Sequence, residues 1–268
     1  MNSMAMKKIA MNGANGRMGR RLVALGHADP RMDLAGAIEY EGSPELGKDA
    51  GLAAGVGEIG VPFADQFSED LDAVIDFSTP AGCEVAVQNC LEKKLPLVVA
   101  TTGLTESQTA QVEEAARQIP LVWAPNMSMA VNLTMKLVES AATSLKNVAS
   151  GVDVEILERH HRFKEDSPSG TALRFGEIVR SAMGQTSEAH GREGLVGQRP
   201  ASELGYHAIR TGDNPGEHTI VFGMLGETIE IRVAASNRDC YALGAIEAAI
   251  WVADKPAGKY SMYDVLGF

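Results

Sequence analysis

One fifteen-residue stretch, from Glu158 to Ala172, combines residue types that transfer protons and bind anions. Its sequence, ERHHRFKEDSPSGTA, contains two adjacent histidines, a lysine and three acids, and then Ser-Gly-Thr. Histidine titrates near neutral pH and gives or takes a proton readily, and Lys164 adds a positive charge four residues after His160. Backbone amides at the start of a helix bind anions. Together these features favour a site for a small carboxylate substrate that must gain a proton.

A strand must present the histidines. The sequence VDVEILERHH alternates apolar and polar residues, which predicts a β-strand in which Glu158 and His160 continue one face. His161 then points to the opposite face. The apolar residues on the first face are Val152, Val154 and Ile156.

A helix is expected after the turn that Asp166 and Pro168 favour. Ser169 is a suitable N-cap residue. This helix would hold the amides of Gly170 and Thr171 at its N-terminus, close to Lys164 and the histidines. Apolar residues recur at helical spacing at Ala172, Phe175, Val179 and Met183.

Two other interpretations of the stretch stay open. Runs of charged residues are usually solvated loops, although a loop does not account for the helix-start pattern. A metal site would need converging ligands, but adjacent histidines of one strand face opposite sides and no metalloprotease spacing is present. We therefore expect no metal site.

A glycine-rich turn near the start predicts a second site. In MNGANGRMGRRL, Gly13, Gly16 and Gly19 follow a strand-like segment and open a helix. Such a turn lets a pyrophosphate approach a helix N-terminus, and Glu39 closes the second strand where an acid can hold ribose hydroxyls. The spacing alone is a weak signal, and a tight turn that binds nothing is the alternative. An NAD(P) site is the better interpretation.

Glu39 also bears on the choice of cofactor. A carboxylate repels a 2′-phosphate, whereas a neighbouring Arg would attract one, and the next residue is Tyr40. NADH is therefore favoured. NADPH stays possible because basic residues of the turn can meet a phosphate: Arg17, Arg20 and Arg21.

The order of apolar segments predicts an α/β protein. From Lys7 to about Ala124, short apolar runs alternate with helical periods, which is typical of a Rossmann-like, doubly wound parallel sheet. After a long expected helix, alternating segments separated by Gly, Pro and Asn predict a mixed or antiparallel sheet in an α+β second domain. The expected domains are 1–129 for dinucleotide binding, 130–236 for substrate binding and oligomerisation, and 237–268 as a segment returning to the first domain.

Composition limits the classes of function. With 45% hydrophobic and 22% charged residues, the chain is typical of soluble globular proteins. The net charge of −11 argues against nucleic acid as a partner. No apolar run has the length of a signal peptide or a membrane span, so we expect a cytoplasmic protein with no membrane partner. We expect the three scattered cysteines to serve in packing.

The motifs together resemble a known family. The pattern E-I-x-E-x-H-x-x-x-K-x-D-x-P-S-G-T-A, from Glu155 to Ala172, is similar to the signature of the dihydrodipicolinate (4-hydroxy-tetrahydrodipicolinate) reductases of bacterial lysine biosynthesis. The resemblance extends over essentially the whole chain, through GANGRMG, DFSTP, ATTG, APNMS and GEHT.

This resemblance implies a reaction and roles for individual residues. The reaction would be NAD(P)H-dependent reduction of the cyclic imine dicarboxylate formed from aspartate semialdehyde and pyruvate. His160 matches the family's proton donor or acceptor, and Lys164 its second proton donor. His161 matches a substrate-binding position, and Gly170 with Thr171 matches the pair that holds a substrate carboxylate.

The resemblance also implies the cofactor residues and a homotetramer built through the sheet of the second domain. Many family members have Arg at the position of Tyr40 and Gly at that of Ala100, so the chain departs from the pattern twice. The matching cofactor positions are Gly13, Ala14, Asn15, Gly16, Arg17 and Met18 in the turn, Glu39, Ala100, Thr101 and Thr102, and Ala124, Pro125, Asn126 and Met127.

Two rival functions remain at this point. One is another two-domain NAD(P) oxidoreductase acting on an amino or keto acid, because the nucleotide domain alone does not name a substrate. The other is a nucleotide sensor without catalysis, which the presence of both His160 and Lys164 disfavours.

Overall fold

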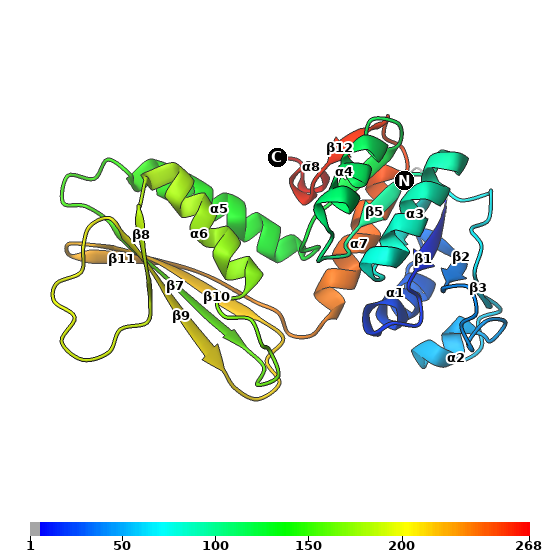
Figure 1. The fold of residues 1–268 in the computed structure, drawn as a ribbon, viewed down its shortest axis with the longest axis horizontal. Helices are drawn as coiled ribbons and strands as arrows, with labels where there is room; N and C mark the ends of the chain where they lie inside the picture. The colour runs from blue at the N-terminus through cyan, green and yellow to red at the C-terminus, as the bar shows by residue number, and fades with distance from the viewer. Residues whose placement is uncertain (1–5) are drawn as a thin grey trace. The chain divides into compact units, whose positions relative to one another are not determined.

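The computed structural model describes residues 6–268 and divides into two compact units (Figure 1). The first unit comprises the chain up to Met129 together with Arg238–Phe268, and the second comprises Ala130–Asn237. The second unit is therefore inserted between two segments of the first. No helix within the described residues is long and apolar enough to cross a membrane.

The first unit contains a parallel sheet of seven strands. Its order is β12-β6-β5-β4-β1-β2-β3, so the chain turns back at β1, where β2 lies on one side and β4 on the other. In open sheets of this kind, ligands bind beyond the carboxyl ends of the strands at this reversal. The strands are β1 (Lys7–Asn12), β2 (Met32–Ile38), β3 (Phe63–Ala64), β4 (Ala73–Asp76), β5 (Leu97–Val99), β6 (Pro120–Trp123) and β12 (Gly258–Tyr260).

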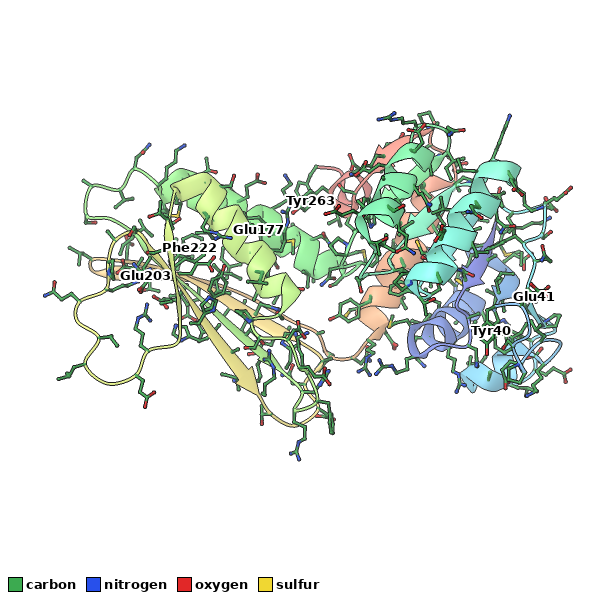
Figure 2. The ribbon with its side chains drawn as sticks, viewed as in Figure 1. Tyr40, Glu41, Glu177, Glu203, Phe222 and Tyr263 are labelled. Atoms are coloured by element: carbon green, nitrogen blue, oxygen red, sulfur yellow. The ribbon has the colours of Figure 1, made fainter. Side chains whose placement is uncertain are left out.

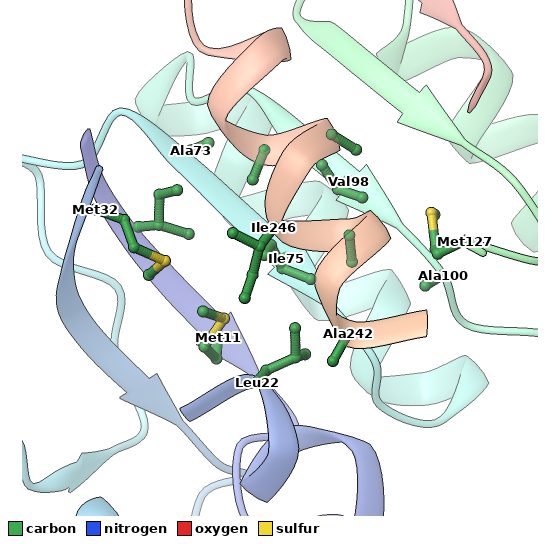
Figure 3. Packing of buried hydrophobic residues seen from close by; sticks show 14 of the residues in the cluster. Met11, Leu22, Met32, Ala73, Ile75, Val98, Ala100, Met127, Ala242 and Ile246 are labelled. Carbon is green, nitrogen blue, oxygen red and sulfur yellow. The ribbon is translucent and has the colours of Figure 1, made fainter. Parts of the chain in front are cut away.

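Helices cover both faces of this sheet, because successive strand residues point to opposite sides. Ile75 belongs to the core shared with α1, α7 and α8, whereas its neighbour Val74 belongs to the core shared with α3 and α4. Figure 3 shows Ile246 of α7 packed beside Ile75, and Ala242 of the same helix belongs to the same core. The predicted doubly wound α/β fold is confirmed. The helices are α1 (Arg17–Ala28), α2 (Ala50–Ala54), α3 (Pro80–Lys93), α4 (Glu106–Ala115), α7 (Asp239–Val252) and α8 (Met262–Leu266).

The second unit contains a mixed sheet of five strands in the order β11-β10-β7-β9-β8. β10 pairs antiparallel with both β7 and β11, whereas β9 pairs parallel with β7 and β8. The sequence did not predict β8 or β9. The elements are α5 (Met129–Leu145), β7 (Asp153–His160), α6 (Gly170–Met183), β8 (Ser187–His190), β9 (Glu203–Arg210), β10 (Glu217–Met224) and β11 (Glu227–Ala234).

The helix α6 packs on one face of this sheet. Figure 1 shows α5 and α6 running along the sheet, and Phe175 of α6 is fully buried, with its ring 5.7 Å from that of His218 on β10. The alternate residues Ile156 and Ile220 are buried on the same face. The end of β7 and the start of α6 therefore lie together, joined by the nine-residue segment 161–169, which contains Lys164 and Asp166.

Candidate active site

The strand β7 ends with its two polar residues on the helix-covered face, as the alternation predicted. Glu158 is 2% exposed and His160 8% exposed. On the neighbouring strands, His218 lies opposite Glu158, and Arg210 lies opposite His160. Four titratable side chains from three adjacent strands thus converge at one corner of the sheet.

Glu158 is the centre of this cluster. Its Oε2 lies 2.6 Å from Nδ1 of His160 and accepts a hydrogen bond from Nη1 of Arg210 at 2.7 Å. Its Oε1 accepts from Nη2 of Arg210 at 2.8 Å and from the backbone amide of Ser169 at 3.1 Å. Because an ionised carboxylate only accepts hydrogen bonds, Nδ1 of His160 is the donor. This leaves Nε2 as the ring nitrogen that would be able to exchange a proton with another molecule.

The charges around the pair shift both pKa values. Burial raises the pKa of Glu158, but hydrogen bonds from Arg210 and His160 outweigh it, so the pKa is below its usual range. Burial lowers the pKa of His160, and Glu158 offsets part of that effect while Lys164 and Arg210 add to it. Glu158 is therefore ionised at neutral pH, and His160 is poised to lose a proton.

The helix α6 begins where the sequence predicted. Ser169 is its N-cap residue, and its Oγ accepts from the amide of Ala172 at 3.2 Å. The same Oγ lies 3.0 Å from Nε2 of His218. Gly170 is exposed, lacks a positive φ, and has open space where a Cβ would stand, so the fold itself does not require glycine there. That glycine keeps the approach to the helix N-terminus clear.

Two other predicted residues lie at the edge of the cluster. Lys164 forms an ion pair with Asp166, with 2.8 Å between Nζ and Oδ1. His161 is half-buried on the segment after β7, and its ring lies 6.2 Å from that of Phe163. Asp166 also accepts a hydrogen bond through its backbone oxygen from Arg210, which ties the segment to β9.

In the first unit, the glycine-rich turn follows β1 and opens α1. Gly13 has a φ of +75°, and a Cβ there would stand 2.7 Å from the backbone oxygen of Phe77. A Cβ on Gly19 would stand 2.1 Å from the oxygen of Gly13. Gly16 and Arg17 are exposed, and α1 has neither a side-chain cap nor an acid in its first turn. The N-terminus of α1 therefore suits a bound anion such as a pyrophosphate.

Glu39 follows β2 and contacts this turn directly. Its Oε1 accepts a hydrogen bond from the backbone amide of Asn15 at 2.8 Å. Arg20 donates from Nε to the backbone oxygen of Asn15 at 3.0 Å, which holds the turn from its other side. Tyr40 is 68% exposed, and Figure 2 shows it beside Glu41 on the segment after β2. Two predicted cofactor residues, Asn15 and Glu39, are thus joined.

Polar side chains connect the carboxyl ends of the central strands. Asp76, at the end of β4, is fully buried and accepts hydrogen bonds from Asn12 at 2.7 Å and from Ser78 at 2.5 Å. The amide of Ser78 donates to Oγ1 of Thr101 at 3.0 Å. The predicted loop after β5 is thereby fixed to the end of β1, next to the glycine-rich turn.

The other predicted loop positions follow strands as expected. Ala100 to Thr102 comes directly after β5, and Ala124 to Met127 directly after β6. Ala100 and Met127 are buried in the same core (Figure 3), so the methyl group of Ala100 fits there. Across residues 6–268, no group of three or more His, Cys, Asp or Glu residues is arranged to hold a metal ion.

Comparison with known proteins identifies the family. A model described as the N-terminus of dihydrodipicolinate reductase matches residues 7–127, and one described as its C-terminus matches residues 130–266. The chain belongs to the dihydrodipicolinate reductase family. A 4-hydroxy-tetrahydrodipicolinate reductase of Rhodopirellula baltica is 57% identical over 97% of this chain and 95% of its own length. One of Syntrophotalea carbinolica is 46% identical over 98% of this chain and 99% of its own length.

Solved structures share the fold. A dipicolinate-bound dihydrodipicolinate reductase from Paenisporosarcina sp. TG-14 has a TM-score of 0.76 at 23% identity, covering 97% of this chain and 98% of its own. Aspartate semialdehyde dehydrogenase II of Vibrio cholerae has a TM-score of 0.54 at 12% identity, covering 94% and 100%. The arrangement is thus shared with another dehydrogenase. Family membership favours the reductase over both rival functions.

Sequence reasoning missed three members of the cluster as site residues. The sequence predicted Glu158 only as a residue on one face of the strand, and His218 appeared only within the motif GEHT. Arg210 carried no signal, because it lies 52 residues beyond Glu158 on a strand that was not predicted. Only the register of β9 against β7 brings it to the site.

His218 provides a test of this buried cluster. Burial, and next the positive charge of His160, lower the pKa of His218 from 6.5 to about 4. The unfolded chain therefore takes up a proton that the folded protein excludes, and stability is lost as the pH falls from about 6.5 to about 4. We expect His218→Asn to reduce the slope of unfolding free energy in this window by up to roughly 1.4 kcal/mol per pH unit.

The measurement is urea denaturation at several pH values. The exposed His27 provides the control, since His27→Asn should keep the wild-type slope. An unchanged slope in His218→Asn would show that this histidine is not held neutral by its surroundings.

Proposed function

We propose that this protein reduces the cyclic imine dicarboxylate derived from aspartate semialdehyde and pyruvate, giving tetrahydrodipicolinate for lysine and diaminopimelate biosynthesis, with NAD(P)H as the reductant. The observation that carries the proposal is the cluster at the end of β7, in a chain of this family. There the ring of His160 is held through Nδ1, beside the N-terminus of α6. The proposal assigns proton donation and carboxylate binding to adjacent groups.

The proton would come from His160. Its Nδ1 is occupied by Glu158, so the proton is held and released at Nε2. Lys164 is the second donor, and its ammonium group is paired with Asp166 at 2.8 Å. Lys164, and His160 in its protonated form, also bring positive charge toward a dianionic substrate, which the net negative charge of the chain would otherwise repel.

The substrate carboxylate would bind at the start of α6. Gly170 and Thr171 are its first residues, where the helix dipole favours negative charge. Ser169 is held from two sides, by Glu158 at its amide and by His218 at its hydroxyl. The helix start is therefore fixed before any ligand binds, which lowers the entropy cost of binding. His161 is the further substrate-binding position.

The cofactor would bind in the first unit, where the residues present fit a dinucleotide. The uncapped start of α1 suits the pyrophosphate, with Gly13 to Met18 forming the turn, and Glu39, which contacts that turn at Asn15, would meet the ribose. A bound nicotinamide supplies the hydride. The loops at 100–102 and 124–127 would line the nicotinamide half.

NADH is the favoured cofactor, and NADPH is accepted less well. This preference follows from the pair Glu39 and Tyr40, because the carboxylate would repel a 2′-phosphate and the next residue has no positive charge to attract one. Arg17, at the first position of α1, is exposed and is available to a phosphate.

Three expectations from the sequence remain predictions. They are the homotetramer built through the sheet of the second unit, the cytoplasmic location, and the division of cofactor and substrate binding between the units. Sedimentation equilibrium tests the homotetramer, and cell fractionation tests the location. The NADH affinity of His160→Gln and Gly170→Ala, described below, tests the division of binding between the units.

The central prediction is the reaction itself. Purified protein given the cyclised product of pyruvate and aspartate semialdehyde should oxidise NADH, and NADPH more slowly. His160→Gln should lose roughly 10²-fold or more in kcat while keeping its affinity for NADH, because general acid catalysis is worth about that much. Absorbance at 340 nm and a nucleotide titration measure the two quantities. The proposal would be wrong if folded protein oxidised neither NADH nor NADPH in the presence of this substrate.

Gly170→Ala tests the carboxylate site. The added methyl group meets no protein atom within 4 Å, so the unfolding free energy should stay the same or rise by a few tenths of a kcal/mol. The same methyl group stands in the approach to the helix N-terminus, so KM for the imine should rise roughly tenfold while NADH affinity is unchanged. Gly223→Ala on β10, which makes only ordinary contacts, is the control. An unchanged KM would remove Gly170 from the substrate site.

Tyr40→Arg tests the cofactor preference. A guanidinium group beside the ribose site should attract a 2′-phosphate and shift the ratio of kcat/KM for NADPH over NADH upward by roughly tenfold, or about 1.4 kcal/mol. Tyr40→Phe keeps the ring and should leave the ratio at the wild-type value. If Tyr40→Arg also leaves this ratio at the wild-type value, another residue determines how the 2′-phosphate is recognised.

A further inference from the structure

Both oxygens of the Glu158 carboxylate accept hydrogen bonds, although the residue itself is almost completely buried. Four hydrogen bonds of 2.6 to 3.1 Å reach it from His160, Arg210 and the amide of Ser169. A carboxylate that is 2% exposed requires such partners, because an unpaired buried charge costs several kcal/mol. Each partner belongs to a different element: β7, β9 and the start of α6.

The three partners have distinct places in the proposed chemistry. His160 is the proton donor, and Ser169 precedes the two residues that would hold the substrate carboxylate. Arg210 donates to both oxygens of Glu158. One buried carboxylate therefore links the group that gives the proton to the helix start that orients the molecule receiving it.

We propose that Glu158 is the positioning residue of this site. Its carboxylate fixes the ring of His160 through Nδ1 and also accepts a hydrogen bond from the amide of Ser169, so the ring keeps a fixed position relative to the first turn of α6. Arg210 donates to both oxygens and keeps the carboxylate ionised. The inference rests on the proposed function for the role of His160. The hydrogen-bond geometry that supports it is independent of that function.

The arrangement fixes which nitrogen reacts. A neutral histidine carries its proton on either nitrogen, and an ionised carboxylate at Nδ1 selects the Nδ1–H form. Protonated His160 then gives up the Nε2 proton and returns to that same form without turning its ring. Loss of an orienting carboxylate in other acid–base enzymes costs up to about 10⁴-fold in kcat, because the wrong tautomer forms.

Glu158 and Arg210 act on His160 with opposite sign. The carboxylate raises the pKa of His160, whereas the guanidinium lowers it. The titratable groups around the ring include Glu158 on β7, Arg210 on β9, His218 on β10 and Lys164 on the segment before α6, and Asp166 forms an ion pair with that lysine. A role in packing alone would not give the two residues opposite effects on one titration.

The same strand carries a matched control. Glu155, three residues earlier and on the other face of β7, also contacts a histidine and arginines: Nε2 of His207 at 2.7 Å, Arg192 at 2.7 Å and Arg199 at 2.9 Å. Removal of the Glu155 carboxylate breaks a comparable network of ion pairs and leaves the groups around His160 in place. Glu155→Gln therefore measures what network loss alone does to the protein.

The first experiment follows the titration of His160 by NMR with histidine labelled at Cε1, without substrate or cofactor. The chain has six histidines, and the signal missing from His160→Gln assigns the one in question. We expect the pKa of His160 to fall in Glu158→Gln, to rise in Arg210→Met, and to stay at the wild-type value in Glu155→Gln. Nitrogen shifts of labelled histidine should show that Glu158→Gln loses the Nδ1–H form.

The second experiment is kinetic. Glu158→Gln should lose roughly 10²-fold in kcat, and its pH profile should move with the pKa of His160. The double variant Glu158→Gln/Arg210→Met removes the buried carboxylate together with the guanidinium group that pairs with it, so neither charge is left without its partner and the variant guards against misfolding of the single variants. It should unfold near the wild-type urea concentration and still lose kcat.

The outcomes separate the inference from the proposed function. Shifts of equal sign in Glu158→Gln and Arg210→Met, or no shift, overturn the positioning role whatever the activity. A double variant with wild-type kcat overturns it as well. If wild-type protein lacks reductase activity, the proposed function fails, while the NMR titration still decides whether Glu158 governs the ring of His160.

Discussion

Burial of the Glu158 carboxylate is the constraint on which the second unit depends. A charge at this depth is tolerated only where hydrogen-bond donors surround it, and its own strand supplies just one of them. The parallel pairing of β9 with β7 supplies the guanidinium of Arg210, which lies opposite His160. A slip of one residue in this pairing would turn Arg210 to the other face of the sheet. The buried charge thus penalises wrong registers and favours the one that forms the site.

Glycine serves different purposes in the two units. Gly13 and Gly19 are needed for the turn itself, because a Cβ at either position would collide with backbone atoms. They would be required even if no nucleotide bound. Gly170 has ordinary backbone angles and open space, so its lack of a side chain matters to whatever approaches the helix. A glycine pattern alone therefore mixes signals of folding with signals of binding.

The sequence predicted the features that depend on neighbours along the chain. The strand from 153 to 160, the cap at Ser169 and the helix after it follow from local periodicity, and so does the alternation of the first unit. It did not predict β9, where Tyr206 is buried while Ala208 and Ile209 are exposed, so the pattern of alternation is broken. Arg210 was missed for the same reason. The contact of Glu39 with Asn15 was also beyond reach, since it depends on how two loops meet.

The insertion of the second unit affects the order in which the protein becomes complete during synthesis. When the chain has been made as far as Asn237, the second unit is whole and six of the seven strands of the first exist. The face that carries Ile75 and Val98 still lacks α7, one of the helices that cover it, because Ala242 and Ile246 have not been made. A nascent chain thus carries a finished second unit together with a sheet of which one apolar face is only partly covered. The close contact of Gly244 with the backbone of Met127 closes the first unit only in the last stage of translation.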